Sequence, residues 1–242
     1  MNIVICDSYE EMSTKAAHIV SKNISGKKCV LGLATGSTPE GMYCQLIKLY
    51  NQGLCDFSKV TTFNLDEYYP ISSQDPQSYR YFMNQKLFNH ININIENTNV
   101  PDGNTEDADK ECIEYERKIY NAGGIDLQVI GMGINGHIGF NEPDDVLVAK
   151  THKTKLTEST LEANSRFFES IDEVPNMALT MGMKTILSSK KILLLVSGAA
   201  KHASLHKLID GIISTQCPVT FLNLHNDVTL ICDKSAYYGV NA

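Results

Sequence analysis

The sequence predicts an α/β fold, in which helices cover both faces of an open, mainly parallel β-sheet. Short β-branched runs alternate along the chain with longer segments of helical period, which is the pattern of such a fold. Most of the runs lack polar alternation, as expected of strands buried on both faces. The 242 residues contain no repeat, low-complexity tract or long linker. We therefore expect a single domain spanning residues 1–242.

The strands are predicted from the apolar runs. In chain order they cover residues 2–6, 29–34, 60–64, 125–131, 191–197, 219–223 and 228–232. Each run is short and most are bounded by glycine, asparagine, aspartate or serine, which is typical of strands in a globular sheet.

Helices are predicted between these runs. Ser8-x-x-Glu11 is a capping box that opens a helix over 8–21. Thr38 followed by Pro39 is typical of an N-cap and first helical position, so a second helix is expected from there to about residue 50. Further helices are predicted over residues 78–88, 106–121 and 199–209. Residues 152–183 show the least regular pattern, and we expect a lid or insertion over the site within this segment.

Composition excludes several classes of function. With 21 basic and 28 acidic residues the net charge is −7, so a nucleic-acid partner is not expected. The longest apolar run, residues 192–196, is far too short to span a bilayer. No signal-peptide pattern opens the chain, and the seven cysteines form no C-x-x-C pair. We therefore expect a cytoplasmic protein with reduced thiols and no membrane partner.

A candidate anion site follows the second predicted strand. The loop at residues 34–39 carries Gly36, Ser37 and Thr38 and opens a helix, so its backbone N–H groups and hydroxyls suit a phosphate. No Gly-Lys-Ser/Thr follows, so the loop is not a P-loop. From these residues alone, a capped turn that allows close packing is an equally good interpretation.

Two polar clusters follow two other predicted strands. Residues 131–136 match G-x-G-x-x-G, but no helix comes next, which excludes a dinucleotide site. Asn135, His137 and Glu142 lie on this turn, and Asp66 and Glu67 follow the strand at 60–64. Adjacent carboxylates often only cap a turn. Because open α/β sheets bind ligands at the carboxyl ends of their strands, we expect both clusters to share one cleft.

No metal site is predicted. His202 and His206 stand four residues apart on an expected helix, but the sequence between them is not that of H-E-x-x-H and no third ligand is apparent. We interpret these histidines as ordinary surface or packing residues.

Four linked motifs resemble those of the glucosamine-6-phosphate deaminase family. They are LATGSTP at 33–39, FNLDEY at 63–68, GMGINGHIGFNEP at 131–143 and ANSRFF at 163–168. Their order and spacing agree along essentially the whole chain. The resemblance implies a modified Rossmann-like sheet. It also implies conversion of glucosamine 6-phosphate and water into fructose 6-phosphate and ammonia, without an organic cofactor or metal.

The resemblance also implies roles for individual residues. Asp66 is expected to act as the base that moves a proton between C2 and C1 of the open-chain sugar. His137 is expected to open the sugar ring, with Glu142 and Asn135 orienting and polarising it. The implied phosphate ligands are Gly36, Ser37, Thr38, Arg166 and Lys201.

The chain departs from the long, hexameric members of the family at three points. One is HKTK at 152–155, where those members have a cationic Arg-x-Lys-Thr. Asn135 replaces their usual aspartate; its carbonyl can accept the imidazole N–H but brings no charge. The carboxyl-terminal extension expected after residue 238 is missing, because the chain ends at Ala242. We therefore expect a monomer or small homo-oligomer rather than a hexamer.

Two other functions are weighed against deamination. Hydrolysis of 6-phosphogluconolactone belongs to a family with the same fold and phosphate loop, but that family usually reads His-Thr-Ala-Ser-Leu-Phe-Pro where this chain reads HIGFNEP at 137–143. A non-catalytic sugar-phosphate sensor is the second alternative, although such regulators carry a DNA-binding module for which this acidic chain has no room.

Overall fold

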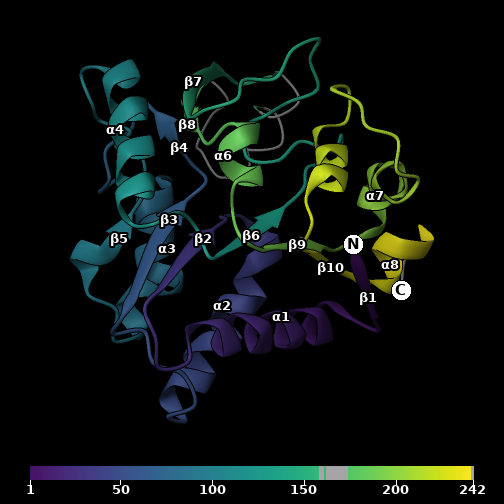
Figure 1. Ribbon diagram of the computed structural model, residues 1–242, viewed down its shortest axis with the longest axis horizontal. Coiled ribbons are helices and arrows are strands. Elements are labelled where there is room, and N and C mark those ends of the chain that lie inside the picture. The colour runs from purple at the N-terminus through teal and green to yellow at the C-terminus, as the bar shows by residue number, and fades with distance from the viewer. Residues whose placement is uncertain (158–160, 162–173, 241–242) are drawn as a thin grey trace.

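The computed structural model describes residues 1–157, 161 and 174–240. Its centre is a seven-stranded sheet in the order β1-β10-β9-β6-β2-β3-β5, in which every neighbouring pair is parallel (Figure 1). The strands are β1 (Asn2–Cys6), β2 (Cys29–Leu33), β3 (Val60–Asn64), β5 (Thr98–Asn99), β6 (Leu127–Gly131), β9 (Ile192–Val196) and β10 (Val228–Asp233). The predicted mainly parallel sheet is confirmed.

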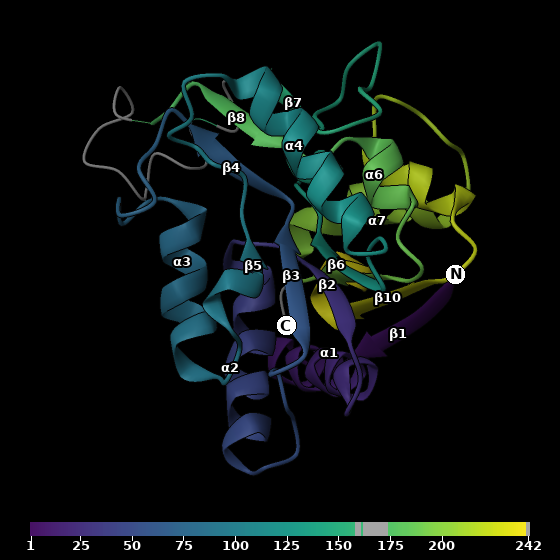
Figure 2. The same cartoon turned by 60° about the vertical axis from the view of Figure 1, so that its left-hand side comes forward.

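Helices cover both faces of the sheet, each over its own apolar cluster. On one face lie α1 (Tyr9–Ile24), α2 (Ser37–Asn51) and α3 (Tyr79–Lys86). On the other lie α4 (Ala108–Asn121), α6 (Met183–Leu187), α7 (His202–Ile209) and α8 (Lys234–Tyr238). Figure 2 shows α1 and α2 below the sheet and α4, α6 and α7 above it. No helix among the described residues has the length and apolar character needed to cross a membrane.

A second, three-stranded antiparallel sheet stands beside the main one. It consists of β4 (Asp66–Tyr69), β8 (Met177–Thr180) and β7 (His152–Lys155). Only Leu65 separates β3 from β4, so the chain passes directly from one sheet to the other. The segment 152–183, whose pattern is the least regular of the chain, thus contains β7 at its start and β8 near its end; neither strand was predicted, because four residues give a short pattern. The middle of this segment lies outside the described residues.

One predicted strand is a helix. Residues 219–223 fall within the 3₁₀-helix η5 (Pro218–Leu224). The apolar run is short, and periodicity alone does not distinguish a buried strand from a buried helical segment. Pro218 favours the helical start, because its ring fixes φ and its missing N–H costs nothing at a first helical position.

The N-terminal residues of α1 and α2 show how each helix is capped. Ser8 Oγ accepts a hydrogen bond from Glu11 N at 3.2 Å, which is one half of the predicted capping box, whereas the Glu11 carboxylate accepts from Asp7 N at 2.6 Å instead of from Ser8 N. Helix α2 begins two residues earlier than expected, at Ser37 instead of Pro39, with Gly36 as its N-cap at φ +90°. Because only glycine adopts this φ readily, the sharp turn from β2 into α2 depends on Gly36.

Candidate active site

The predicted site residues lie on loops at one edge of the main sheet. The strands β9, β6, β2 and β3 are consecutive neighbours, and they are parallel, so their carboxyl ends meet there. From β2 the chain proceeds outward to β3, whereas from β6 it proceeds the other way to β9. Such a switch point leaves a crevice between the two loops, the usual ligand site of an open α/β sheet.

Asp66 is placed by the passage between the two sheets. Leu65 N donates to Leu33 O at 3.0 Å, and Met181 N donates to Leu65 O at 2.7 Å, so the residue before Asp66 is held from both sides. Asp66 then pairs with Thr180 of β8 and is only 6% exposed. Burial, and secondly the charge of Glu67, raises the pKa of Asp66 to about 8. Such a carboxyl can gain and lose a proton near neutral pH.

Glu67 anchors the strand that carries Asp66. Its carboxylate accepts hydrogen bonds from Tyr79 N at 2.7 Å and Arg80 N at 2.9 Å, at the start of α3. Burial raises the pKa of Glu67, whereas these N–H groups and the Arg80 charge oppose the shift. Glu67 thus fixes β4 against α3 and places a second carboxyl beside Asp66.

The turn after β6 is held in one shape by its glycines. Gly133 N donates to His137 O at 2.9 Å, which closes the turn, and Val219 N donates to Gly136 O at 2.8 Å, which fixes it to η5. Gly136 has φ +87°, and a Cβ there would lie 2.4 Å from Cys217 Sγ. Glycine is therefore required at position 136 both by conformation and by space.

The imidazole of His137 packs against the backbone of Gly133. A Cβ at Gly133 would lie 2.3 Å from the ring. His137 Nδ1 is 3.1 Å from Glu142 Oε1, an ion-pair separation rather than an aligned hydrogen bond. Asn135 Nδ2 donates to the other oxygen, Glu142 Oε2, at 2.7 Å. The three predicted residues therefore form a chain in which Asn135 holds Glu142 and Glu142 faces the imidazole.

Asn135 reaches the backbone of His137 and not its ring nitrogen. Its carbonyl oxygen accepts from His137 N at 3.2 Å. The expectation that this oxygen could accept the imidazole N–H is therefore corrected. The carboxyl group that lies beside the ring is that of Glu142.

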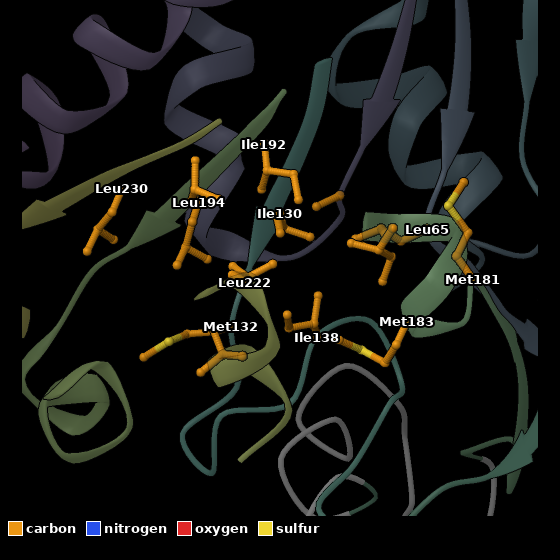
Figure 3. Packing of buried hydrophobic residues seen from close by; sticks show 14 of the residues in the cluster. Leu65, Ile130, Met132, Ile138, Met181, Met183, Ile192, Leu194, Leu222 and Leu230 are labelled. Atoms are coloured by element: carbon orange, nitrogen blue, oxygen red, sulfur yellow. The ribbon is translucent and has the colours of Figure 1, made fainter. Parts of the chain in front are cut away.

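Gly139 brings the two acid/base clusters together. It has φ +57°, and a Cβ there would lie 3.2 Å from Asp66 Oδ2 and 2.8 Å from Thr180 Oγ1. Thr180 Oγ1 also accepts from Phe140 N at 3.1 Å, so β8 supports the same turn. Ile138, between His137 and Gly139, points into the buried apolar cluster (Figure 3). Gly139 lies in a motif noted from the sequence, but no sequence signal indicated its contact with Asp66 or the part played by Thr180.

The candidate phosphate loop, residues 34–39, lies near the end of β6, where the turn of residues 131–139 begins. Gly36 leaves the start of α2 without a side-chain cap, and a Cβ at Gly36 would meet nothing within 4 Å. A Cβ at Gly131 would lie 3.9 Å from Thr38 Cβ, so the loop adjoins the end of β6. Lys201 approaches from the loop after β9, where its Nζ donates to Met132 O at 2.8 Å. Arg166 lies outside the described residues.

No metal centre is found in the part of the chain that the structure describes, where no group of three or more His, Cys, Asp or Glu side chains is placed to hold an ion. His202 Nδ1 and His206 Nε2 instead contact the carbonyl oxygen of Tyr237, at 3.0 and 2.9 Å. These two histidines join α7 to α8.

Comparisons with known proteins find relatives that match nearly the whole chain. Residues 7–231 match the family model described as glucosamine-6-phosphate isomerases/6-phosphogluconolactonase. The chain is 56% identical to the glucosamine-6-phosphate deaminase of Thermoanaerobacter sp. (strain X514) over 237 residues, which cover 98% of this chain and 94% of the relative. It is 55% identical to the enzyme of that name from Clostridium acetobutylicum, with 98% of each chain covered.

Solved structures give the same result. A structure described as a monomeric glucosamine-6-phosphate deaminase has a TM-score of 0.96 at 47% identity and covers 99% of this chain and 100% of its own. A 6-phosphogluconolactonase from Thermotoga maritima has a TM-score of 0.74 at 22% identity, over 96% of this chain and 99% of its own, which shows a shared fold.

Proposed function

This chain belongs to the glucosamine-6-phosphate isomerase/6-phosphogluconolactonase family, and on that premise we propose that it converts glucosamine 6-phosphate and water into fructose 6-phosphate and ammonia. The observation that carries the proposal is the closeness of Gly139 to Asp66, since a Cβ at Gly139 would lie 3.2 Å from Asp66 Oδ2; a buried carboxyl therefore lies next to the loop of His137 and Glu142. Deamination of an aldose needs both a group that opens the ring and a base that moves a proton between two neighbouring carbons.

In the proposed reaction His137 transfers a proton between the sugar's ring oxygen and its C1 hydroxyl, which opens the ring. Asp66 then removes the C2 proton and returns a proton at C1. This produces a ketimine, and its hydrolysis consumes water and releases ammonia. One carboxyl can serve both carbons because the two lie next to each other on the same face of the intermediate. A positioned acid or base of this kind typically accelerates a reaction by about 10² to 10⁴.

We assign the substrate phosphate to the α2 start, Lys201 and Arg166. The α2 start and Lys201 are supported by their closeness to adjacent residues: Thr38 lies near Gly131, and Lys201 donates to the carbonyl oxygen of Met132. A helix N-terminus with free N–H groups and a nearby ammonium suits an anion. This local pocket explains how a protein of net charge −7 binds an acidic sugar.

Lys201→Met is expected to raise KM for glucosamine 6-phosphate by roughly 10- to 100-fold, because a hydrogen bond to a charged group contributes about 1.5–3 kcal/mol. kcat should change much less, because the phosphate is remote from C1 and C2. Steady-state kinetics of ammonia release measure both constants. An unchanged KM would place the phosphate elsewhere.

The pH profile tests Asp66 as the base. Because the base must be ionised and its pKa is raised to about 8, kcat/KM should rise with pH through that region. Glu67→Gln removes the neighbouring charge, lowers the pKa of Asp66 and should move this rise to lower pH. An ionisation of the substrate alone would give a rise that the Glu67 variant leaves in place.

The activity itself is tested with purified protein, without added cofactor, by following ammonia and fructose 6-phosphate together. Both products should appear in equal amounts. A parallel assay with 6-phosphogluconolactone tests the lactonase alternative; the Thermotoga maritima lactonase, at 22% identity, supports a shared fold alone. Binding of glucosamine 6-phosphate without turnover would instead support the alternative that the protein is a non-catalytic sugar-phosphate sensor.

We further propose that the protein is a monomer or small homo-oligomer, since the structural relative at 47% identity is described as monomeric. Light scattering during size exclusion should give a mass near the 26.8 kDa of one chain or a small multiple of it. We infer a cytoplasmic location from its seven cysteines, all free thiols, as is usual in a reducing compartment. No nucleic acid or membrane is proposed as a partner.

A further inference from the structure

Asp233 is a buried carboxylate that none of the proposed chemical steps uses. It ends β10, one residue beyond the pairing of Cys232 with Val196 of β9, and is only 5% exposed. The loop that follows β9, residues 197–201, therefore starts beside it. This is the loop that delivers Lys201 to the candidate phosphate pocket.

The two oxygens of Asp233 hold two different segments. Toward the loop, Ser197 Oγ donates a short hydrogen bond to Oδ2, and Gly198 N lies 3.2 Å from both oxygens. Toward α8, Ser235 Oγ and Ala236 N donate to Oδ1 at 2.8 and 2.7 Å. One carboxylate thus fixes the turn before Lys201 to the capped start of the last helix.

The turn at Gly198 connects the hydrogen bonds of Asp233 to Lys201 through only a few residues. Gly198 has φ +94°, a conformation that favours glycine, and its carbonyl accepts from Lys201 N at 3.0 Å. Residues Ala199–Lys201 form the single 3₁₀ turn η4. A shift of Gly198 therefore moves the backbone of Lys201, and with it the ammonium that now donates to Met132 O.

We propose that Asp233 is a positioning residue for the substrate phosphate, which acts by clamping the Ser197–Gly198 turn and thereby placing Lys201. The inference rests on the proposed function, since it requires Lys201 to bind phosphate. Burial by itself would raise the pKa of Asp233, but the hydrogen bonds from Ser197, Ala236, Ser235 and Gly198 hold it below its ordinary value. The clamp is therefore ionised, and its hydrogen bonds have the added strength of a charged acceptor.

The chain offers a matched pair of variants for the test. Ser197→Ala removes a hydroxyl donor on the loop side of Asp233, whereas Ser235→Ala removes a hydroxyl donor on the α8 side. We expect Ser197→Ala to raise KM for glucosamine 6-phosphate by about 3- to 10-fold, the equivalent of roughly one hydrogen bond. kcat should stay within about 2-fold, and Ser235→Ala should leave both constants near those of the parent.

Asp233→Asn extends the test, with Lys201→Met as the second arm of a double-mutant cycle. An amide presents an N–H₂ to donors that already point at it, so KM should rise by about 10-fold or more. In the Lys201→Met background, neither Asp233→Asn nor Ser197→Ala should raise KM further, because the ammonium they position is gone. Thermal melts of every variant identify any general loss of fold.

The outcomes separate the two proposals. If Lys201→Met leaves KM unchanged, the phosphate assignment under the proposed function fails. If Lys201→Met raises KM but the Ser197 and Asp233 variants do not, or if their effects persist undiminished without Lys201, the positioning role of Asp233 is overturned. A fall in Tm shared equally by Ser197→Ala and Ser235→Ala, with equal changes in KM, would also overturn it, since the role would then be general stability.

Discussion

Asp66→Asn is expected to lower kcat by about 10²- to 10⁴-fold while glucosamine 6-phosphate still binds. The amide is nearly isosteric with the carboxyl but cannot take up the C2 proton. Ammonia release measures turnover, and calorimetric titration of the substrate measures binding. The control is Asp227→Asn, which changes an exposed aspartate just before the start of β10 and should retain parent activity. A variant with near-normal turnover would remove Asp66 from the reaction.

The same substitution should stabilise the fold at slightly alkaline pH. The folded-state pKa of Asp66, about 8, lies above the ordinary value of 3.8. The stability that the neutral carboxyl contributes is therefore complete below pH 4 and is lost as pH rises through 8. Asp66→Asn should raise Tm at pH 8 by roughly 2–4 °C for each kcal/mol recovered, with little gain near pH 4. If the Tm of Asp66→Asn at pH 8 is equal to or lower than that of the parent, burial of the Asp66 charge does not destabilise the fold.

His137→Gln is expected to reduce kcat/KM by about 10²- to 10⁴-fold, because the closed sugar then lacks its ring-opening group. Glutamine keeps a polar side chain of similar reach but does not exchange protons. The control is His18→Gln on the exposed side of α1, which should behave as the parent. Initial rates at low substrate concentration give kcat/KM directly. A loss smaller than 10-fold would exclude His137 from ring opening.

Gly133→Ala tests the placement of the same ring without removing it. The added methyl would lie 2.3 Å from the imidazole, so the ring must leave its position beside Glu142. The obstructing group is a side chain, which can rotate, so Tm should fall little. We expect kcat/KM to fall by about 10-fold or more, in line with loss of part of the acid/base contribution. Normal activity would mean that the ring need not rest on Gly133.

The buried parallel strands and most of the helices were predictable because their signals are local and repeated. Six of the seven predicted strands are present, and the Ser8 side chain caps α1 by accepting from Glu11 N, as predicted. The strands β4, β7 and β8 were missed because each has four residues and carries polar or mixed side chains. Residues 219–223 were assigned wrongly because a short apolar run fits a strand and a buried helical turn equally well.

The sequence by itself determined the order of the motifs, their positions at strand ends and the chemical types of Asp66, His137, Glu142 and Lys201. These follow from residue identity and local spacing. Only the tertiary structure decided that Glu142 faces the imidazole, that Gly139 lies close to the Asp66 carboxyl and that Asp233 is hydrogen-bonded to the turn before Lys201. Each of these contacts joins segments brought together by sheet order or turn geometry, and the raised pKa of Asp66 arises from its burial and from the neighbouring charge of Glu67. Desolvation and cross-strand contact are properties of the packed chain, so no local pattern encodes them.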